Sequence, residues 1–197
     1  MYKFYLNLII IITCITNAQP KSNLEIINSL IDSAAGEISN NYEHISSQFL
    51  LQINTPEEFD FLKNRITYSL TNSGLDIVVN NDTANPKIFF NLNNAATNYK
   101  QIIKDGILGD LLLERELIIS GTYYLKNDYK VGNSKKFYFS KIDTVLLDDV
   151  EKIEISSLPF TKDEIPSEPF FAGIIEPAVA LGTVVVTVIL FFTVRSN

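Results

Sequence analysis

Carboxylates are the side chains of this sequence best suited to acid–base or metal chemistry. Four of them, Asp143, Asp148, Asp149 and Glu151, lie close together. Paired carboxylates can transfer protons or bind calcium. Asp143 and Thr144 also suit the start of a helix that runs to about residue 152, whose dipole would favour the other three acids in its first turns. We expect a helix start here, with no metal ligand and no catalytic residue.

Other catalytic groups are scarce. His44 is the one histidine, and no serine has the spacing of a nucleophile elbow. No glycine-rich phosphate loop occurs. The run Glu114-Arg115-Glu116 predicts a solvated strand face or an inter-strand pair. We therefore expect no catalysis and no cofactor. The alternatives are a membrane-tethered hydrolase that uses acidic residues, and a module that binds a small ligand or lipid.

Aromatic side chains crowd one expected hairpin. Strand alternation places Tyr124 and Tyr138 opposite to Tyr123, Phe137 and Phe139, which would face the core. Exposed aromatic residues are enriched in protein interfaces. Tyr124 and Tyr138 are thus a tentative partner-binding patch. The alternative is a sheet covered by helices on both faces.

Helical patterns occupy the first part of the domain. Apolar residues recur at helical spacing from Leu24 to Ile38 after Asn23. A strand is expected over 44–53. Thr55, Pro56 and Glu58 have the spacing of a capping box, which predicts a helix to about 71. The inward side chains of that helix would be Phe59, Leu62, Ile66 and Leu70.

Strand patterns follow Gly74, and the period changes to two. Strands are expected over 75–79, 87–93, 111–126 and 136–142, with 99–103 continuing or pairing with the second. This order predicts an α+β fold, a two-layer sandwich of amphipathic helices on a mixed, largely antiparallel sheet. The exported domain would span 19–155, and a stalk rich in proline and acid would span 156–170.

The amino-terminal residues have the three-part pattern of a secretory signal peptide. Lys3 precedes an apolar core, and Ala18 ends a run of small residues. We expect a leader over 1–18, cleaved after Ala18; an uncleaved anchor is the alternative. Cleavage would remove Cys14, the one cysteine, and with it any disulfide or cysteine metal site.

The carboxyl-terminal residues predict a transmembrane anchor over 171–194. Its helix core would start at Pro177 and run to Val194, which at 1.5 Å per residue is about 27 Å. Arg195 begins a cytoplasmic tail of 195–197, as expected for a basic residue after an apolar span. Ala178 and Gly182 make one face of the helix small, so homo-oligomerisation through the anchor is an expectation.

The net charge is −7, with 16 basic and 23 acidic residues. Such a balance argues against nucleic-acid binding, and the densest basic pair is Lys135-Lys136.

The region Thr55–Ile142 is similar to small α/β modules of bacterial envelope proteins. The similarity lies in the passage from helix to strand at residues 74–79 and in the long hairpin after it. The modules meant are those of the curli-secretion lipoprotein group, flagellar periplasmic proteins and the amino-terminal domain of the Tol-system propeller protein. The resemblance implies assembly or partner binding without catalysis. It covers under half of the chain, and those proteins do not generally carry such a terminal span.

These patterns together predict a single-pass, non-catalytic membrane protein of the cell envelope. A bacterial inner membrane with the domain in the periplasm is favoured. The expected partners are the lipid bilayer and an envelope protein, and the expected role is binding or assembly of an envelope or secretion complex.

Overall fold

The computed structural model describes residues 19–42, 44–45, 48–78, 86–106, 109–128, 130–168 and 172–195. Its elements in chain order are α2 (Asn23–Tyr42), β1 (Phe49–Asn54), η1 (Glu57–Leu62), α3 (Lys63–Asn72), β2 (Ile77–Val78), β3 (Lys87–Lys104), β4 (Leu111–Asn127), β5 (Lys130–Val131), β6 (Lys135–Leu146), η2 (Leu147–Asp149), α4 (Val150–Ile153), η3 (Pro159–Thr161) and α5 (Ala172–Arg195). The predicted leader 1–18, Cys14, residues 169–171 and residues 196–197 lie outside the described residues.

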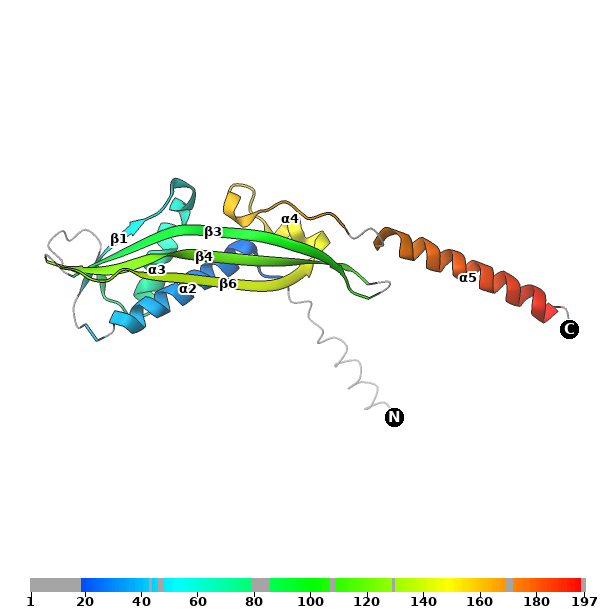
Figure 1. Ribbon diagram of the computed structural model, residues 1–197, viewed down its shortest axis with the longest axis horizontal. Helices are drawn as coiled ribbons and strands as arrows, with labels where there is room; N and C mark the ends of the chain where they lie inside the picture. The colour runs from blue at the N-terminus through cyan, green and yellow to red at the C-terminus, as the bar shows by residue number, and fades with distance from the viewer. Residues whose placement is uncertain are drawn as a thin grey trace, which may run out of the picture.

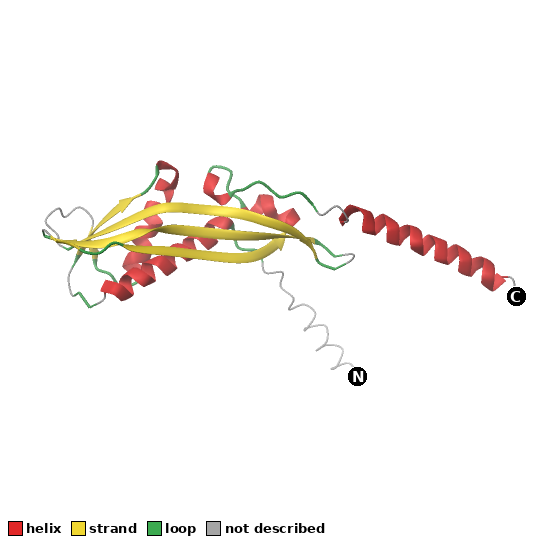
Figure 2. Cartoon of the chain, in the orientation of Figure 1, coloured by secondary structure: helices red, strands yellow, loops and turns green. Residues whose placement is uncertain are grey.

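The long strands β3, β4 and β6 dominate the sheet (Figures 1 and 2). β3, β4 and β6 form an antiparallel meander, whereas β1 is parallel to both β2 and β3. The predicted α+β class and the mixed, largely antiparallel sheet are therefore confirmed. The strand order is β2-β1-β3-β4, and β5 and β6 both pair with β4.

The helices α2, α3 and α4 lie on one side of the sheet. Ten residues of α2 are buried, and its apolar stripe packs with α3 and with alternate residues of the long strands into one core. The inward strand residues include Ile88, Phe90, Leu117, Ile119 and Phe137. Because the helices cover this face alone, alternate residues of β6 point into solvent.

β3 is longer than the sequence suggested because two irregularities interrupt its alternation. The register with β4 shifts between Leu92 and Asn94 and again between Tyr99 and Gln101. Each shift moves the buried positions by one residue, so Leu92 is followed inside by Ala95, and Tyr99 by Ile102. The two predicted segments 87–93 and 99–103 are thus parts of one strand.

The helix expected after Thr55 exists, but its cap is different. Its four predicted inward residues, Phe59, Leu62, Ile66 and Leu70, are all buried. The chain first forms the 3₁₀ turn η1, and Pro56 stands at the cap position without a side-chain hydrogen bond. The Thr55 hydroxyl donates to the Asp60 carboxylate at 2.9 Å. The predicted capping box is therefore wrong.

Asp143 and Thr144 belong to β6 and do not cap a helix. β6 continues to Leu146, and the short helix α4 follows the η2 turn. The physical reason is the partner of Asp143, since Arg115 on the neighbouring strand binds its carboxylate at 2.6 Å. The predicted helix start at Asp143 is therefore wrong.

The first part of the expected stalk packs against the domain. Phe160 is buried and meets the Phe59 ring edge-on at 5.7 Å. The Thr97 hydroxyl donates to the Phe160 carbonyl, and the backbone N–H of Tyr99 donates to the Asp163 carboxylate. Residues through Asp163 thus contribute to the folded domain, although the sequence placed 156–170 in a linker.

α5 begins at Ala172, so Pro177 lies inside the helix and not at its first position. Figure 1 shows α5 extending away from the sheet. Over the described ranges, no helix reaches both the length and the apolarity that crossing a membrane requires. The single-pass transmembrane anchor predicted over 171–194 is therefore not supported, although a helix is present.

Candidate functional site

The candidate site is the face of β3, β4 and β6 turned away from the helices, which we call the open face. Strand alternation assigns residues to it. Tyr123 and Phe137 are buried on the helix side, so their neighbours Tyr124 and Tyr138 point to the open face. The predicted sorting of these aromatics matches the structure. The alternative with helices on both faces does not hold for the described residues.

Tyr124 and Tyr138 share the open face but do not touch. Tyr124 stacks on Phe89 of β3, with ring centroids 4.7 Å apart and planes 5° from parallel. Tyr138 lies opposite Ser120 of β4. Ser120 and Tyr124 are four residues apart on that strand, which corresponds to about 13 Å between these two positions. Tyr138 is 62% exposed. The tentative patch is therefore two separate aromatic positions.

Aliphatic side chains that the sequence analysis did not single out extend the open face along β6. Ile142 is 60% exposed, and Leu146 is 40% exposed. Leu146 forms a row across three strands with Leu112 and Ile103. These residues occupy outward positions of β3, β4 and β6, so the alternation that places Tyr138 on the open face also places them there.

Polar contacts connect the strands over the rest of the open face. The Asn54 amide donates to the Asn91 side-chain oxygen at 2.8 Å, and the Asn91 amide donates to the Thr122 hydroxyl at 3.0 Å. Farther along, Lys100 and Glu116 form an ion pair at 2.6 Å. This ion pair raises the pKa of Lys100 through the hydrogen bond to Glu116. The face thus combines ordered polar rows with exposed apolar positions.

Arg115 lies on the opposite, helix-covered face and is fully buried. Its guanidinium donates to both oxygens of Asp143, at 2.6 and 3.1 Å, to the Asn23 side-chain oxygen, and to the Lys21 carbonyl at 3.0 Å. The predicted inter-strand pair is therefore correct, but a solvated position for Arg115 is wrong. Its spacing of two from buried Leu113 and Leu117 is the signal that marks it as inward.

Two buried tyrosines complete the polar contacts beneath the sheet. The Tyr99 hydroxyl donates to Glu154 at 2.7 Å and accepts from Asn23 at 3.1 Å. The Tyr123 hydroxyl donates to Glu37 at 2.8 Å. Burial raises the pKa of both phenols well above the ordinary value, and hydrogen bonds to the two carboxylates raise it further. These groups connect helices to strands.

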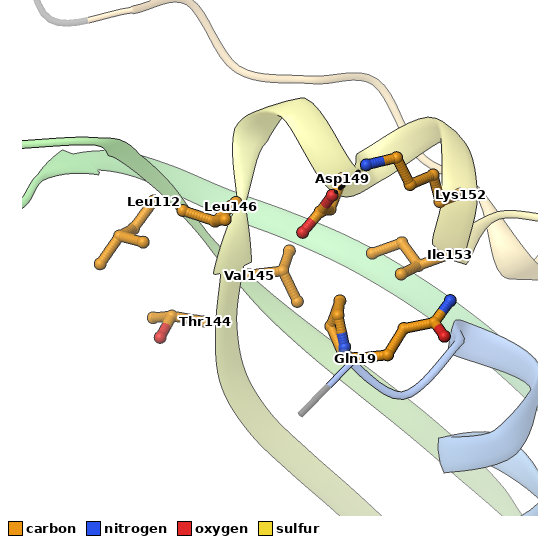
Figure 3. A pocket seen from close by; sticks show the side chains of 9 residues that line it. Gln19, Leu112, Thr144, Val145, Leu146, Asp149, Lys152 and Ile153 are labelled. Atoms are coloured by element: carbon orange, nitrogen blue, oxygen red, sulfur yellow. Dashed lines mark hydrogen bonds and ion pairs between the residues drawn. The ribbon is translucent and has the colours of Figure 1, made fainter. Parts of the chain in front are cut away.

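Two cavities flank α4. The first, of about 610 Å³, has Val145, Leu146 and Ile153 in its lining, with Gln19 and the ion-paired Asp149 and Lys152 (2.6 Å) beside them, as Figure 3 shows. The second, of about 670 Å³, is lined mainly by acids and by Ile165, Pro166 and Ile102.

The predicted carboxylate cluster is dispersed. Asp143 binds Arg115, Asp149 binds Lys152, and Asp148 and Glu151 line the second cavity. In the part of the chain that is described, no three His, Cys, Asp or Glu residues are placed to hold a metal. His44 is exposed in a turn, away from these acids in the sequence.

The predicted anchor residues lie on α5 or at its end. Pro177 and Ala178 are exposed, nothing lies within 4 Å of the place that a Cβ on Gly182 would take, and Arg195 is the last helical residue. The hydroxyls of Thr183 and Thr187 donate to carbonyls one turn earlier, both at 2.8 Å. The expected oligomerisation through Ala178 and Gly182 stays a prediction.

Comparison with known proteins gives distant structural similarities. No protein-family model matches the chain. No curated protein matches its sequence. A minor lipoprotein from Acinetobacter baumannii is 16% identical with a TM-score of 0.34, covering 53% of this chain and 69% of its own. The rare lipoprotein B from Shewanella oneidensis is 15% identical with a TM-score of 0.32, covering 49% and 68%. Similarities at this level transfer no function, and the resemblance to the curli-secretion, flagellar and Tol modules stays a prediction.

Proposed function

We propose that this protein is a non-catalytic, membrane-associated component of the cell envelope that binds a protein partner through the open face of its sheet. The observation that carries the proposal is the one-sided packing of the helices. An antiparallel sheet with one solvated face ordinarily presents polar residues there. Here Tyr138 and Ile142 are each about three-fifths exposed on that face.

The exposed positions suit protein recognition. Aromatic residues anchor interfaces because they bury a large area at low cost in side-chain entropy. Tyr138 and the stacked pair of Phe89 and Tyr124 are rigidly carried by long paired strands. Covering a large apolar side chain contributes about 1.5–3 kcal/mol. A partner that seats on these positions would find a preformed surface.

The membrane association rests on α5. Its large apolar side chains from Val179 to Phe192 are between 42% and 68% exposed. Exposed apolar side chains such as these are stabilised where water is excluded from them. We propose that the membrane covers α5 and that the domain lies on the extracytoplasmic side, as the leader-like pattern of 1–18 predicts.

Site-specific photo-crosslinking in native membranes tests partner binding. A photoreactive residue at position 138 of the full chain is expected to give a product with a different protein. The matched control is position 64, where exposed Asn64 lies on α3 at the opposite side of the sheet. Equal products at both positions, or none at 138, would overturn the proposal. A product of two copies of this chain alone would also overturn it.

A further inference from the structure

β6 forms an open edge of the sheet. It pairs with β4 over residues 135–146 without a register shift, and no described strand pairs with its other side. Its twelve residues include no proline and no glycine. The outward backbone N–H and C=O groups of such an edge are a template for another strand.

The side chains of β6 are complementary to themselves around Ile142. We propose that β6 pairs with β6 of a second copy of this chain, antiparallel and centred on Ile142, so that the two sheets continue as one. This dimer is held by the backbone edge of β6 and requires no partner protein, and open-face side chains of β6 flank its junction.

On the open face, the register centred on Ile142 would pair apolar residues with apolar residues and hydroxyl residues with hydroxyl residues. Ile142 would lie opposite Ile142 of the second copy, Tyr138 opposite Leu146, and Ser140 opposite Thr144. Tyr138, Ile142 and Leu146 are exposed in the single chain. Directly opposed residues in an antiparallel pair have Cβ atoms about 4.5–5.5 Å apart, so the three apolar positions would form one cluster across the junction.

On the helix side, the same register joins opposite charges. Lys141 would lie opposite Asp143 of the second copy, and this contact occurs twice by symmetry. Lys141 is exposed, and no carboxylate is within ion-pair distance of it in the described residues. Asp143 is 30% exposed beyond its bond to Arg115, which leaves an accessible carboxylate edge. Phe139 and Val145 would be the next opposed pair.

The neighbouring registers are less favourable. A pair centred on Lys141 opposes two lysines, and a pair centred on Asp143 opposes two aspartates. A pair centred on Ser140 sets Phe139 against Lys141. Since like charges directly opposite destabilise a strand pair, the side chains select the register centred on Ile142.

Disulfide trapping of the full chain tests the register. On a Cys14→Ser background, Ile142→Cys places the two thiols opposite each other, where Cα atoms of antiparallel pairs lie about 4.5–5.5 Å apart and a disulfide can form. Ser140→Cys is the matched control, because the two copies of residue 140 would be about 13 Å apart. We expect the Ile142→Cys chain to crosslink at least tenfold faster than the Ser140→Cys chain.

Mixing Ser140→Cys with Thr144→Cys chains gives a second trap, since these positions are opposed only in the Ile142 register. This mixture is expected to crosslink at a rate similar to that of the Ile142→Cys chain. Equal rates for the Ser140→Cys and Ile142→Cys chains, as contact through α5 alone would give, would overturn the proposal. So would faster crosslinking of the Ser140→Cys chain, or no crosslinking at any of these positions.

A charge reversal tests the pairing without new thiols. Lys141→Glu would oppose Asp143 of the second copy and is expected to weaken the dimer about tenfold in sedimentation of the detergent-solubilised chain. Lys130→Glu, on exposed β5, is the matched control and should leave the dissociation constant unchanged. A chain that is monomeric before any substitution, or equal weakening by both changes, would contradict the dimer.

Discussion

At the residue scale, Arg115 shows how one buried cation organises several segments. Its guanidinium binds Asp143 of β6, Asn23 at the start of α2 and the Lys21 carbonyl. The Asn23 amide continues these contacts to the Thr161 carbonyl at 2.8 Å. The charge is thus compensated inside the fold, and the segment before α2 is attached to the sheet through it.

Replacing Arg115 by Met is expected to lower the free energy of unfolding by about 3 kcal/mol, because Asp143 and Asn23 lose their buried partner. Urea unfolding measures the loss. Lys100→Met is the matched control: it removes an ion pair in which the Lys100 side chain is 44% exposed, and should cost less than about 1 kcal/mol. Equal losses would show that Arg115 is not a structural centre.

Tyr99 and Tyr123 predict a loss of stability at alkaline pH. The pKa of each phenol is raised in the fold, chiefly by burial. An unfolded tyrosine ionises near pH 10. Above about pH 10 the unfolded chain therefore releases protons that the folded chain retains, and the free energy of unfolding falls as pH rises.

The Tyr123→Phe variant should show a shallower alkaline decline, by about 1.4 kcal/mol per pH unit. Urea unfolding series between pH 8 and about pH 12 check this slope. Parallel curves for the variant and the native chain would contradict the attribution of the alkaline loss of stability to Tyr123.

Strand alternation predicted the orientation of Tyr123, Tyr124 and Phe137 because local geometry determines it. The same alternation also places Arg115 inward. A charged residue at an inward position requires a partner, however, and the sequence of one strand does not show a partner on another strand. Asp143 is 28 residues away in sequence. The capping box failed for a related reason, since Thr55 bonds with Asp60 and not with the backbone.

At the element scale, Gly121 permits the close approach of β3, β4 and β6. A Cβ there would lie 2.1 Å from the Asn91 carbonyl oxygen and 2.6 Å from the Phe137 ring. Gly121→Ala is expected to destabilise the protein by about 1–3 kcal/mol, because the strand must shift.

Gly36→Ala is the matched control for this prediction. Nothing lies within 4 Å of its added Cβ, and the residue is inside α2. This change should stabilise the protein by about 0.5–1 kcal/mol through the better helix propensity of alanine. Thermal unfolding of the two variants in opposite directions would support the packing, and a neutral Gly121→Ala would contradict it.

The helix α2 was predicted better than the ends of the strands. Its apolar period is continuous, so the sequence predicted a helix here, although the helix continues to Tyr42. The length of β3 did not follow from the sequence, because the irregularities at Leu92/Asn94 and Tyr99/Gln101 break the period of two. The end of β6 was missed because Asp143 and Thr144 have side chains typical of a helix start, whereas pairing with β4 keeps them extended.

At the scale of the whole molecule, the fold has one layer of helices against one face of a long sheet (Figure 2). The fold class followed from the order of patterns. The sequence could not predict that helices cover one face only, because this depends on where η1, α4 and η3 pack in the folded chain. The expected stalk was partly wrong for this reason, since Phe160 reaches the core from a segment rich in proline and acid.

The apolar surface of α5 predicts that charge on it reduces membrane association. Val185 and Ile189 lie one turn apart and are 56% and 59% exposed. In vesicle flotation, changing both to Lys should shift the protein from the floating vesicle fraction to the bottom fraction of unbound protein. The same two charges at Asn64 and Thr71 on α3 are the control and should have no such effect. Unchanged flotation of the α5 variant would contradict membrane association.

Two exposed tyrosines on opposite sides of the molecule give the most direct test of partner binding. Tyr138 on the open face is 62% exposed, and Tyr68 on α3 is 56% exposed. Modification by a tyrosine-specific reagent is compared between native membranes and purified protein in the same oligomeric state. The proposed function predicts that Tyr138 is protected in native membranes while Tyr68 reacts equally in both samples. Equal reactivity of Tyr138 in the two samples would contradict it.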